Sequence, residues 1–233
     1  MDEARRIAIV GAESTGKSTR ARELAAALAA AGLRVAHVDE HLREWCDLRG
    51  RTPQAAEQAA ILREQHRRID AAAVRHDVVV CDTTGLVTAA YSRLLFDDAS
   101  LEAEAAQWHR RCDVTLLTAL DLPWVPDGLQ RDGAHVREPV DSLLRAALAA
   151  HRLPYAVIGG SGPRRLSAAL DALPPAWRGV APPGPGDGPA RAAAAPRGGG
   201  LFTRLEAGDP APSWNCECCV PAAERLLRRG ATP

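Results

Sequence analysis

Eight residues near the N-terminus have the types and spacing needed to hold a chain of phosphates. Residues 11–18 read Gly-Ala-Glu-Ser-Thr-Gly-Lys-Ser, which matches the pattern G-x-x-x-x-G-K-[ST] of a phosphate-binding loop. In such a loop successive backbone N–H groups face phosphate oxygens, the lysine reaches the β- and γ-phosphates, and the next hydroxyl ligates Mg²⁺. We therefore expect ATP and Mg²⁺ as cofactors. The predicted nucleotide-binding residues are Gly11, Glu13, Ser14, Thr15, Gly16, Lys17, Ser18 and Thr19.

Lys17 is the only lysine in the sequence, although lysine and arginine together number 29. The chain otherwise uses arginine as its cation. The compact ammonium of lysine is not interchangeable with a planar guanidinium at a phosphate. The retention of one lysine at this position favours a functional loop over a chance match and places Lys17 among the catalytic residues.

Acidic residues at the ends of two predicted strands supply carboxylates to the same region. Residues 33–38 alternate apolar and polar types and lead to Asp39 and Glu40, while the apolar residues 78–81 lead to Asp82. The carboxyl ends of parallel strands line the ligand crevice of an open α/β sheet. Asp82 is therefore predicted to serve Mg²⁺ together with Ser18. For Asp39 and Glu40, the alternative is a helix N-cap followed by a first-turn acid.

The elements that must position these groups alternate regularly along the chain. Strands are predicted over residues 6–10, 33–38, 78–82, 113–118 and 155–158. Helices are predicted over residues 19–31, 52–74, 84–95, 100–111, 138–150 and 163–173. The second helix is expected to open with Thr52 as N-cap and Pro53 at its first position. This order predicts an α/β fold, a three-layer α/β/α P-loop NTPase of the nucleoside-kinase type with a five-stranded parallel sheet.

A loop rich in proline and glycine follows the fourth predicted strand. Residues 119–131 contain Trp124, Asp127 and Arg131, and Arg137 comes shortly afterwards. A loop of this kind can close over the phosphates and exclude water, so Arg131 and Arg137 are predicted catalytic arginines. The alternative is an ordinary connector with a hydrophobic anchor.

The C-terminal part of the chain has a different composition. The predicted kinase domain covers residues 4–179, and residues 180–200 are dominated by proline, glycine, alanine and arginine, which predicts a disordered linker. Residues 201–233 form a short segment with Cys216, Cys218 and Cys219. These thiols could bind Zn²⁺ or contact a partner. A structural zinc site needs four ligands, so a redox-sensitive or functionally neutral tail is the alternative.

Composition limits the class of partner. The formal net charge is +0, hydrophobic residues make up 46% of the chain, and aromatic residues only 4%. These values give no electrostatic footprint for nucleic acid or for an anionic membrane, and they favour a small-molecule substrate. No apolar run approaches the roughly 18 residues of a membrane span, and the first residues lack a signal-peptide pattern. We expect a cytoplasmic protein whose cysteines are free or bind metal.

Four phrases of the sequence resemble the ribosylnicotinamide kinase domain of the NadR family, within the P-loop AAA-family ATPases and kinases. They are GAESTGKST at 11–19, EHLREW at 40–45, CDTT at 81–84 with Thr88 and Tyr91, and LPWVPDGL at 122–129. The resemblance covers about residues 6–160, and P-W-V-x-D-G-L is its most specific part. It implies phosphoryl transfer from ATP to the 5′-hydroxyl of nicotinamide riboside, giving nicotinamide mononucleotide.

The resemblance also implies roles for individual residues. Glu40 or Asp39 would accept the hydroxyl proton or hold the ribose, and Arg43 would face the phosphates. Trp124 and Tyr91 would offer flat faces to a cationic pyridinium. Asp127 would bind ribose hydroxyls.

The sequence departs from the family pattern at two informative positions. Thr84 stands where the family has the second acid of D-T-D, and Gln130 stands where it has an arginine, with Arg131 one place later. These changes keep open a kinase for another nucleoside or for a nucleotide. A nucleotide-sensing regulatory ATPase is the alternative outside enzymes of this type.

Overall fold

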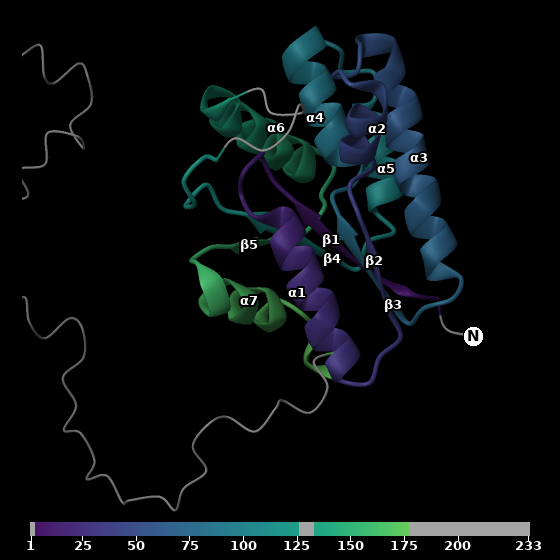
Figure 1. Cartoon of the computed structure of the whole chain (residues 1–233), viewed down its shortest axis with the longest axis vertical. Coiled ribbons are helices and arrows are strands. Elements are labelled where there is room, and N and C mark those ends of the chain that lie inside the picture. The colour runs from purple at the N-terminus through teal and green to yellow at the C-terminus, as the bar shows by residue number, and fades with distance from the viewer. Residues whose placement is uncertain (1–2, 126–132, 178–233) are drawn as a thin grey trace, which may run out of the picture. The chain divides into compact units, whose positions relative to one another are not determined.

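The computed structural model describes residues 3–125 and 133–177 (Figure 1). The chain divides into two units, Met1–Gly184 and Pro185–Pro233, and every described residue belongs to the first. Asp127, Gln130 and Arg131 therefore lie outside the described residues, as do the predicted linker and the cysteine-containing segment.

A five-stranded sheet forms the centre of the described unit, as predicted. Its strands run in the order β2-β3-β1-β4-β5, and every pairing is parallel. The strands are β1 (Arg5–Val10), β2 (Val35–Val38), β3 (Val78–Asp82), β4 (Val114–Thr118) and β5 (Ala156–Ile158). The phosphate loop leaves the central strand β1, so the carboxyl ends of its neighbours β3 and β4 flank it.

Helices connect successive strands. They are α1 (Lys17–Ala30), α2 (His41–Arg49), α3 (Ala55–Ala73), α4 (Gly85–Phe96), α5 (Glu102–His109), α6 (Arg137–Ala150) and α7 (Gly162–Asp171), with 3-10 turns η1 (Ala134–Val136) and η2 (Pro175–Trp177). None of the described helices combines the length and apolar character needed to cross a bilayer.

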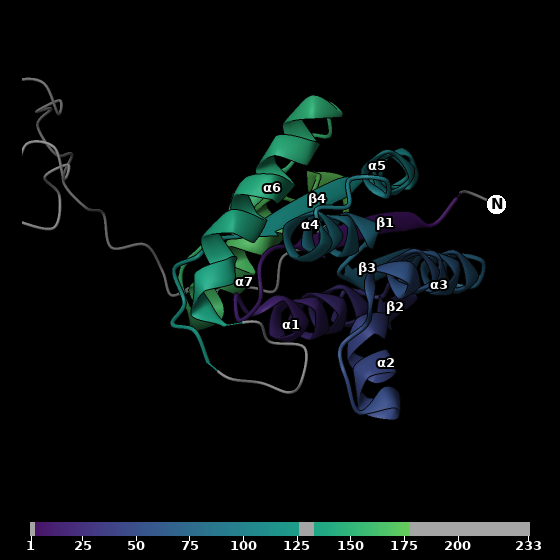
Figure 2. The same ribbon diagram turned by 90° about the horizontal axis from the view of Figure 1, so that it is seen from above.

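Two details differ from the sequence prediction. Helix α3 has Gln54 as its N-cap, instead of Thr52, because the carboxylate of Glu57 accepts the Gln54 N–H at 2.8 Å and closes the first turn one residue beyond Pro53. No helix was assigned over residues 41–49, because they are mostly polar and bury only Cys46. The alternative given for Asp39 and Glu40, the start of a helix, is close to the structure, in which Glu40 is the N-cap of α2. Figure 1 and Figure 2 show α2 next to α3, with which it is in contact.

Alternation along the strands produces two apolar faces. Ile7 and Ile9 pack with α1 and α7, together with Val80 of β3. On the opposite face, Val10 and Leu117 pack with α4, α5 and α6. The sheet is thus covered on both sides, as parallel sheets require, and its carboxyl edge remains available for ligands.

Candidate active site

The phosphate loop is held by a threonine from the neighbouring strand β4. The hydroxyls of Thr15 and Thr118 are 2.6 Å apart, and Thr118 also donates to the carbonyl oxygen of Val10 at 3.2 Å. Gly11 has a φ of 152°, and a Cβ at this position would lie 2.0 Å from Thr118 Oγ1. Only glycine therefore fits at the start of the loop. Sequence reasoning missed Thr118, because its partners lie about a hundred residues away.

Lys17 is positioned at the first turn of α1. Gly16 precedes it with φ 77°, a left-handed conformation that turns the chain into the helix. The Lys17 ammonium donates to the carbonyl oxygen of Ala12 at 2.9 Å, and the side chain is only 8% exposed. The ammonium thus lies inside the curve of the phosphate loop. A bound phosphate could replace the Ala12 carbonyl oxygen as the acceptor of its hydrogen bond.

Glu13 and Ser14 connect the phosphate loop to the segment around Trp124. The buried carboxylate of Glu13 accepts hydrogen bonds from Trp124 Nε1 at 2.7 Å and from the backbone N–H of Gly133 at 3.0 Å. Val125 N donates to Ser14 Oγ at 2.8 Å, and that hydroxyl also lies 3.2 Å from the Val125 carbonyl oxygen. Two residues of the phosphate loop therefore bind the Trp124 segment.

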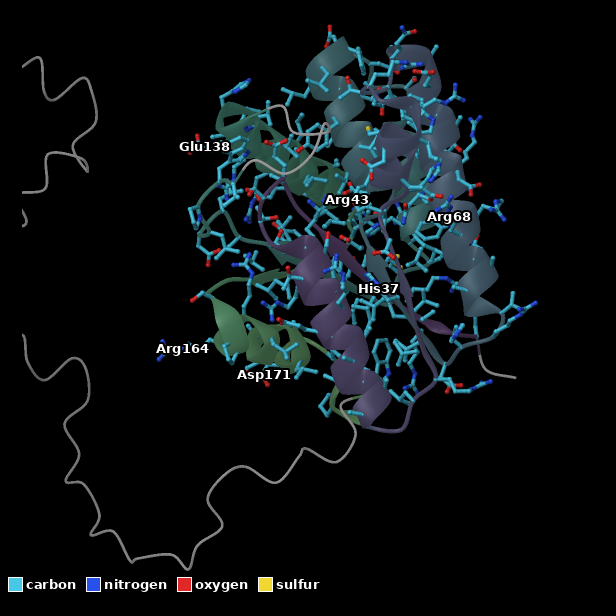
Figure 3. The ribbon with its side chains drawn as sticks, viewed as in Figure 1. His37, Arg43, Arg68, Glu138, Arg164 and Asp171 are labelled. Carbon is cyan, nitrogen blue, oxygen red and sulfur yellow. The ribbon has the colours of Figure 1, made fainter. Side chains whose placement is uncertain are left out.

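A buried arginine binds the backbone of the phosphate loop and of two neighbouring segments. Arg165 of α7 has no exposed surface, and its guanidinium donates to the carbonyl oxygens of Thr15 at 3.0 Å, Ala119 at 3.1 Å and Gly160 at 2.8 Å. It also forms an ion pair with Asp121. Nothing in the local sequence distinguishes Arg165 from the exposed Arg164 beside it, which Figure 3 labels.

A cavity of about 710 Å³ lies against the phosphate loop. Residues 14–19 form one wall, Arg22, Glu40 and Arg43 a second, and Leu122, Pro123 and Val125 a third. The loop amides and the positive end of the α1 dipole face it, so this cavity suits the phosphates of a nucleotide. Arg43, labelled in Figure 3, lines this cavity.

A second cavity of about 320 Å³ adjoins the first. Its walls come from the phosphate loop, the start of α2, the approach to α3 and the outer half of α4. The lining residues are Glu13, Lys17, Glu40, Leu42, Thr52, Pro53, Gln58, Val87, Tyr91, Leu95 and Phe96. Lys17 and Glu40 line both cavities.

One glutamine of α3, Gln65, binds the backbone on both sides of Glu40. Gln65 accepts the His41 N–H at 2.7 Å, and its amide donates to the carbonyl oxygen of Asp39 at 3.3 Å. Gln65 is buried, so the backbone around Glu40 is pinned to α3. Asp39 is exposed and lines neither cavity among the described residues. The structure thus separates the two acids that the sequence left equivalent.

Asp82 ends β3 beside the phosphate loop strand and is 1% exposed. Its Oδ1 is buried, with no hydrogen-bond partner in the described part of the chain. Thr83, which follows, has a φ of 76°, an unfavourable value for a β-branched residue that is kept mainly where surrounding structure enforces it. An unpaired buried carboxylate oxygen at this edge fits a cation-binding role.

Two buried histidines hold the turn after Asp82. His109 bridges the hydroxyls of Thr84 at 3.0 Å and Thr115 at 2.8 Å, while His66 Nε2 accepts the Gly85 N–H at 3.2 Å. Burial lowers the pKa of each histidine to about 4, because charged imidazolium is poorly solvated there. Thr84, which replaces the family's second acid, thus forms part of a neutral packing network.

The predicted site residues fall into two groups. One group meets around the two cavities and comprises residues 13–19, Glu40, Arg43 and Tyr91. Trp124 and Arg137 lie nearby but line neither cavity in the described ranges: the indole binds Glu13, and the Arg137 guanidinium donates to the Leu122 carbonyl oxygen at 2.8 Å. Phe96 and Gln58, which do line a cavity, were not predicted. No local sequence pattern identified either residue.

Solved structures share this fold. A NadR protein in complex with NAD and AMP-PNP matches with a TM-score of 0.59 and 20% identity over 72% of this chain and 48% of that one. A NadR protein in complex with NR matches with a TM-score of 0.58 and 20% identity, over 72% and 50%. A thymidylate kinase from Ehrlichia chaffeensis matches with a TM-score of 0.53 and 15% identity, over 73% and 97%.

The chain thus spans about half the length of the NadR structures it matches. No curated protein matches the sequence. The profile of the AAA domain family AAA_28 matches residues 6–165, which include the phosphate loop, the lining residues of both cavities and the five strands except Arg5 at the start of β1. The expected P-loop fold of the NadR kind is confirmed, and the chain belongs to the AAA_28 family of AAA domains.

Proposed function

We propose that the protein transfers the γ-phosphoryl group of ATP to the 5′-hydroxyl of nicotinamide riboside, giving nicotinamide mononucleotide and ADP. The observation that carries this proposal is the pair of adjoining cavities with Lys17 and Glu40 in both linings. A donor nucleotide in the larger cavity and an acceptor in the smaller one would meet at these two side chains. Phosphoryl transfer depends on such positioning and on charge stabilisation.

The shared residues suit the reaction step. The acceptor oxygen forms a bond to the γ-phosphorus while the bond from that phosphorus to the bridging oxygen breaks and ADP leaves. Glu40 takes the hydroxyl proton, and Lys17 and Arg43 stabilise charge on the phosphates. Mg²⁺, when bound, neutralises phosphate charge, and the Ser18 hydroxyl and the Asp82 carboxylate would hold it.

The charge of the smaller cavity favours a nucleoside over a nucleotide. Its described lining has two carboxylates, Glu13 and Glu40, and one ammonium, Lys17, but no arginine to bind an acceptor phosphate. Tyr91 and Phe96 supply aromatic surface, which attracts a cationic ring more than a neutral one. A riboside with a positively charged pyridinium matches this lining. The similarity in fold to a NadR protein solved in complex with NR supports the same substrate.

The test is ADP release with Mg-ATP and a panel of acceptors that includes nicotinamide riboside, neutral nucleosides and thymidine monophosphate. We expect the riboside to stimulate ADP release most strongly, with a phosphorylated product of matching mass. Stimulation by other acceptors alone would disprove the substrate assignment. Slow ATP turnover that no acceptor changes would instead favour a regulatory ATPase.

Two neighbouring acids provide a matched comparison for the general base. Glu40→Gln removes the proton acceptor that lines both cavities and is expected to lower kcat by about 100-fold or more. Asp39→Asn changes a carboxylate outside both linings and is expected to have a much smaller effect. Equal losses in the two variants would contradict the assignment of Glu40 as the base.

A further inference from the structure

We propose that His37, Asp39 and Asp82 form a binding site for a divalent transition-metal ion. One ligand atom from each residue can be chosen so that all three lie within 4.8 Å of one another. An imidazole nitrogen with two carboxylate oxygens suits Zn²⁺, Co²⁺ or Mn²⁺, whereas Mg²⁺ prefers oxygen ligands alone. The proposal does not depend on the kinase activity.

Strand geometry explains why these residues meet. His37 and Asp39 are two apart on β2 and its continuation, so their side chains leave the same face of the sheet. The parallel register pairs Val38 with Cys81, which places Asp39 beside Asp82 one step further along. His37 pairs with Val80, whose side chain packs on the α1 face. All three groups therefore share the α1 face, where Figure 3 labels His37.

Two buried polar atoms of the cluster favour the binding of a cation. Among the described residues, neither His37 Nε2 nor Asp82 Oδ1 has a hydrogen-bond partner, although both atoms are buried. Asp82 as a whole is almost fully buried, and an isolated buried carboxylate oxygen is costly. His37 Nδ1 lies 3.7 Å from Asp39 Oδ1, too far for a good hydrogen bond. A metal ion would satisfy both the imidazole and the carboxylate.

The cluster differs from the magnesium site of the phosphate loop. In the strand order β2-β3-β1, His37 and Asp39 come from the side of β3 that faces away from the loop strand. Only Asp82 is common to the two sites. Ser18, at the start of α1, is needed for the magnesium site alone.

The test is a Co²⁺ titration of the nucleotide-free full chain, followed by visible absorption. Cys216, Cys218 and Cys219 are replaced by serine in every sample, so that the tail thiols cannot bind the probe. We expect one Co²⁺ per chain, with affinity reduced by more than about 10-fold in His37→Ala and in Asp39→Asn. Because Asp39 is exposed, Asp39→Asn keeps the proposal testable if His37→Ala fails to fold.

Two controls separate this site from other binding. Ser18→Ala and the exposed-histidine variant His135→Ala are both expected to leave the Co²⁺ affinity unchanged. Absence of saturable binding would show that the cluster is only a histidine–carboxylate pair and would overturn the proposal. So would unchanged binding in both His37→Ala and Asp39→Asn, or loss of binding in Ser18→Ala, which would place the ion at the phosphate loop.

Discussion

The Trp124 indole N–H donates to the Glu13 carboxylate at 2.7 Å, across 111 residues of sequence. The same carboxylate oxygen accepts the Gly133 N–H, and the Glu13 backbone N–H donates to the Tyr91 hydroxyl at 3.2 Å. Glu13, a residue of the phosphate loop, thus links that loop to Tyr91 in the wall of the smaller cavity and to the segment that contributes Val125 to the larger one. A change at Glu13 or at its partners should therefore alter binding in both cavities.

Trp124→Phe should raise the KM for ATP and lower the free energy of unfolding by about 1–2 kcal/mol. The phenyl ring retains most of the apolar volume, but the buried Glu13 carboxylate loses one of its donors. Urea unfolding and initial-rate kinetics measure the two effects. Trp108→Phe is the matched control, since it removes an indole N–H that donates to Asp70 at 3.2 Å, away from both cavities. An equal rise of the KM for ATP in that control would contradict the role given to Glu13.

Lys17→Ala should abolish phosphoryl transfer, with kcat reduced by at least about 100-fold, because the ammonium is the cation shared by the two cavities. Lys17→Arg should not restore the rate, since the larger planar guanidinium cannot occupy the same position over the loop. Both variants should remain folded, because the hydrogen bond from the Lys17 ammonium to the Ala12 carbonyl oxygen is of the kind worth about 1 kcal/mol. Activity of Lys17→Arg close to that of the unaltered protein would disprove this explanation of the lone lysine.

Arg165→Met should destabilise the fold by about 3 kcal/mol or more, because it leaves three carbonyl oxygens and Asp121 without their cationic donor. Thermal or urea unfolding measures the loss. Arg164→Met, at the exposed neighbouring position, should change stability by less than about 0.5 kcal/mol. Similar losses in the two variants would show that the buried network under the phosphate loop is not important for stability.

The free energy of unfolding should fall with pH over a range set by the two buried histidines, His66 and His109. Their pKa is about 4 when folded and about 6.5 when unfolded. Their neutral forms therefore contribute full stability above pH 6.5, and this contribution is lost as the pH falls toward 4, by about 3 kcal/mol for His109. Urea unfolding across this range should show the dependence of stability on pH, and His109→Asn should reduce its slope, leaving the contribution of His66.

Acidic residues should titrate in a lower window than the histidines. Arginine partners hold the pKa of Glu57, Glu64 and Asp77 at about 2, so their contributions persist until the pH falls below about 4. A loss of stability confined to pH values below 4 would therefore contradict the assignment of the upper window to His66 and His109.

Local sequence patterns determined the fold class and the position of the phosphate loop. The glycines and Lys17 of the phosphate loop, the apolar strand before it and the acids at strand ends are all features of neighbouring residues. Strand and helix preferences likewise depend on short stretches, which is why the five parallel strands were predicted correctly. The unpredicted α2 and the displaced start of α3 are places where polar composition and a capping interaction outweighed the simple pattern.

Tertiary structure decided which candidate residues meet. It separates Glu40, which lines both cavities, from Asp39, which joins His37 and Asp82, because backbone geometry sends adjacent residues in different directions. It also assigns the Trp124 indole to Glu13. These contacts depend on non-sequential strand order and on hydrogen bonds between residues far apart in the chain, and no local pattern encodes either. The sequence by itself therefore determined what chemistry is available, and the packing of α3, α4 and α7 against the sheet decided where it can occur.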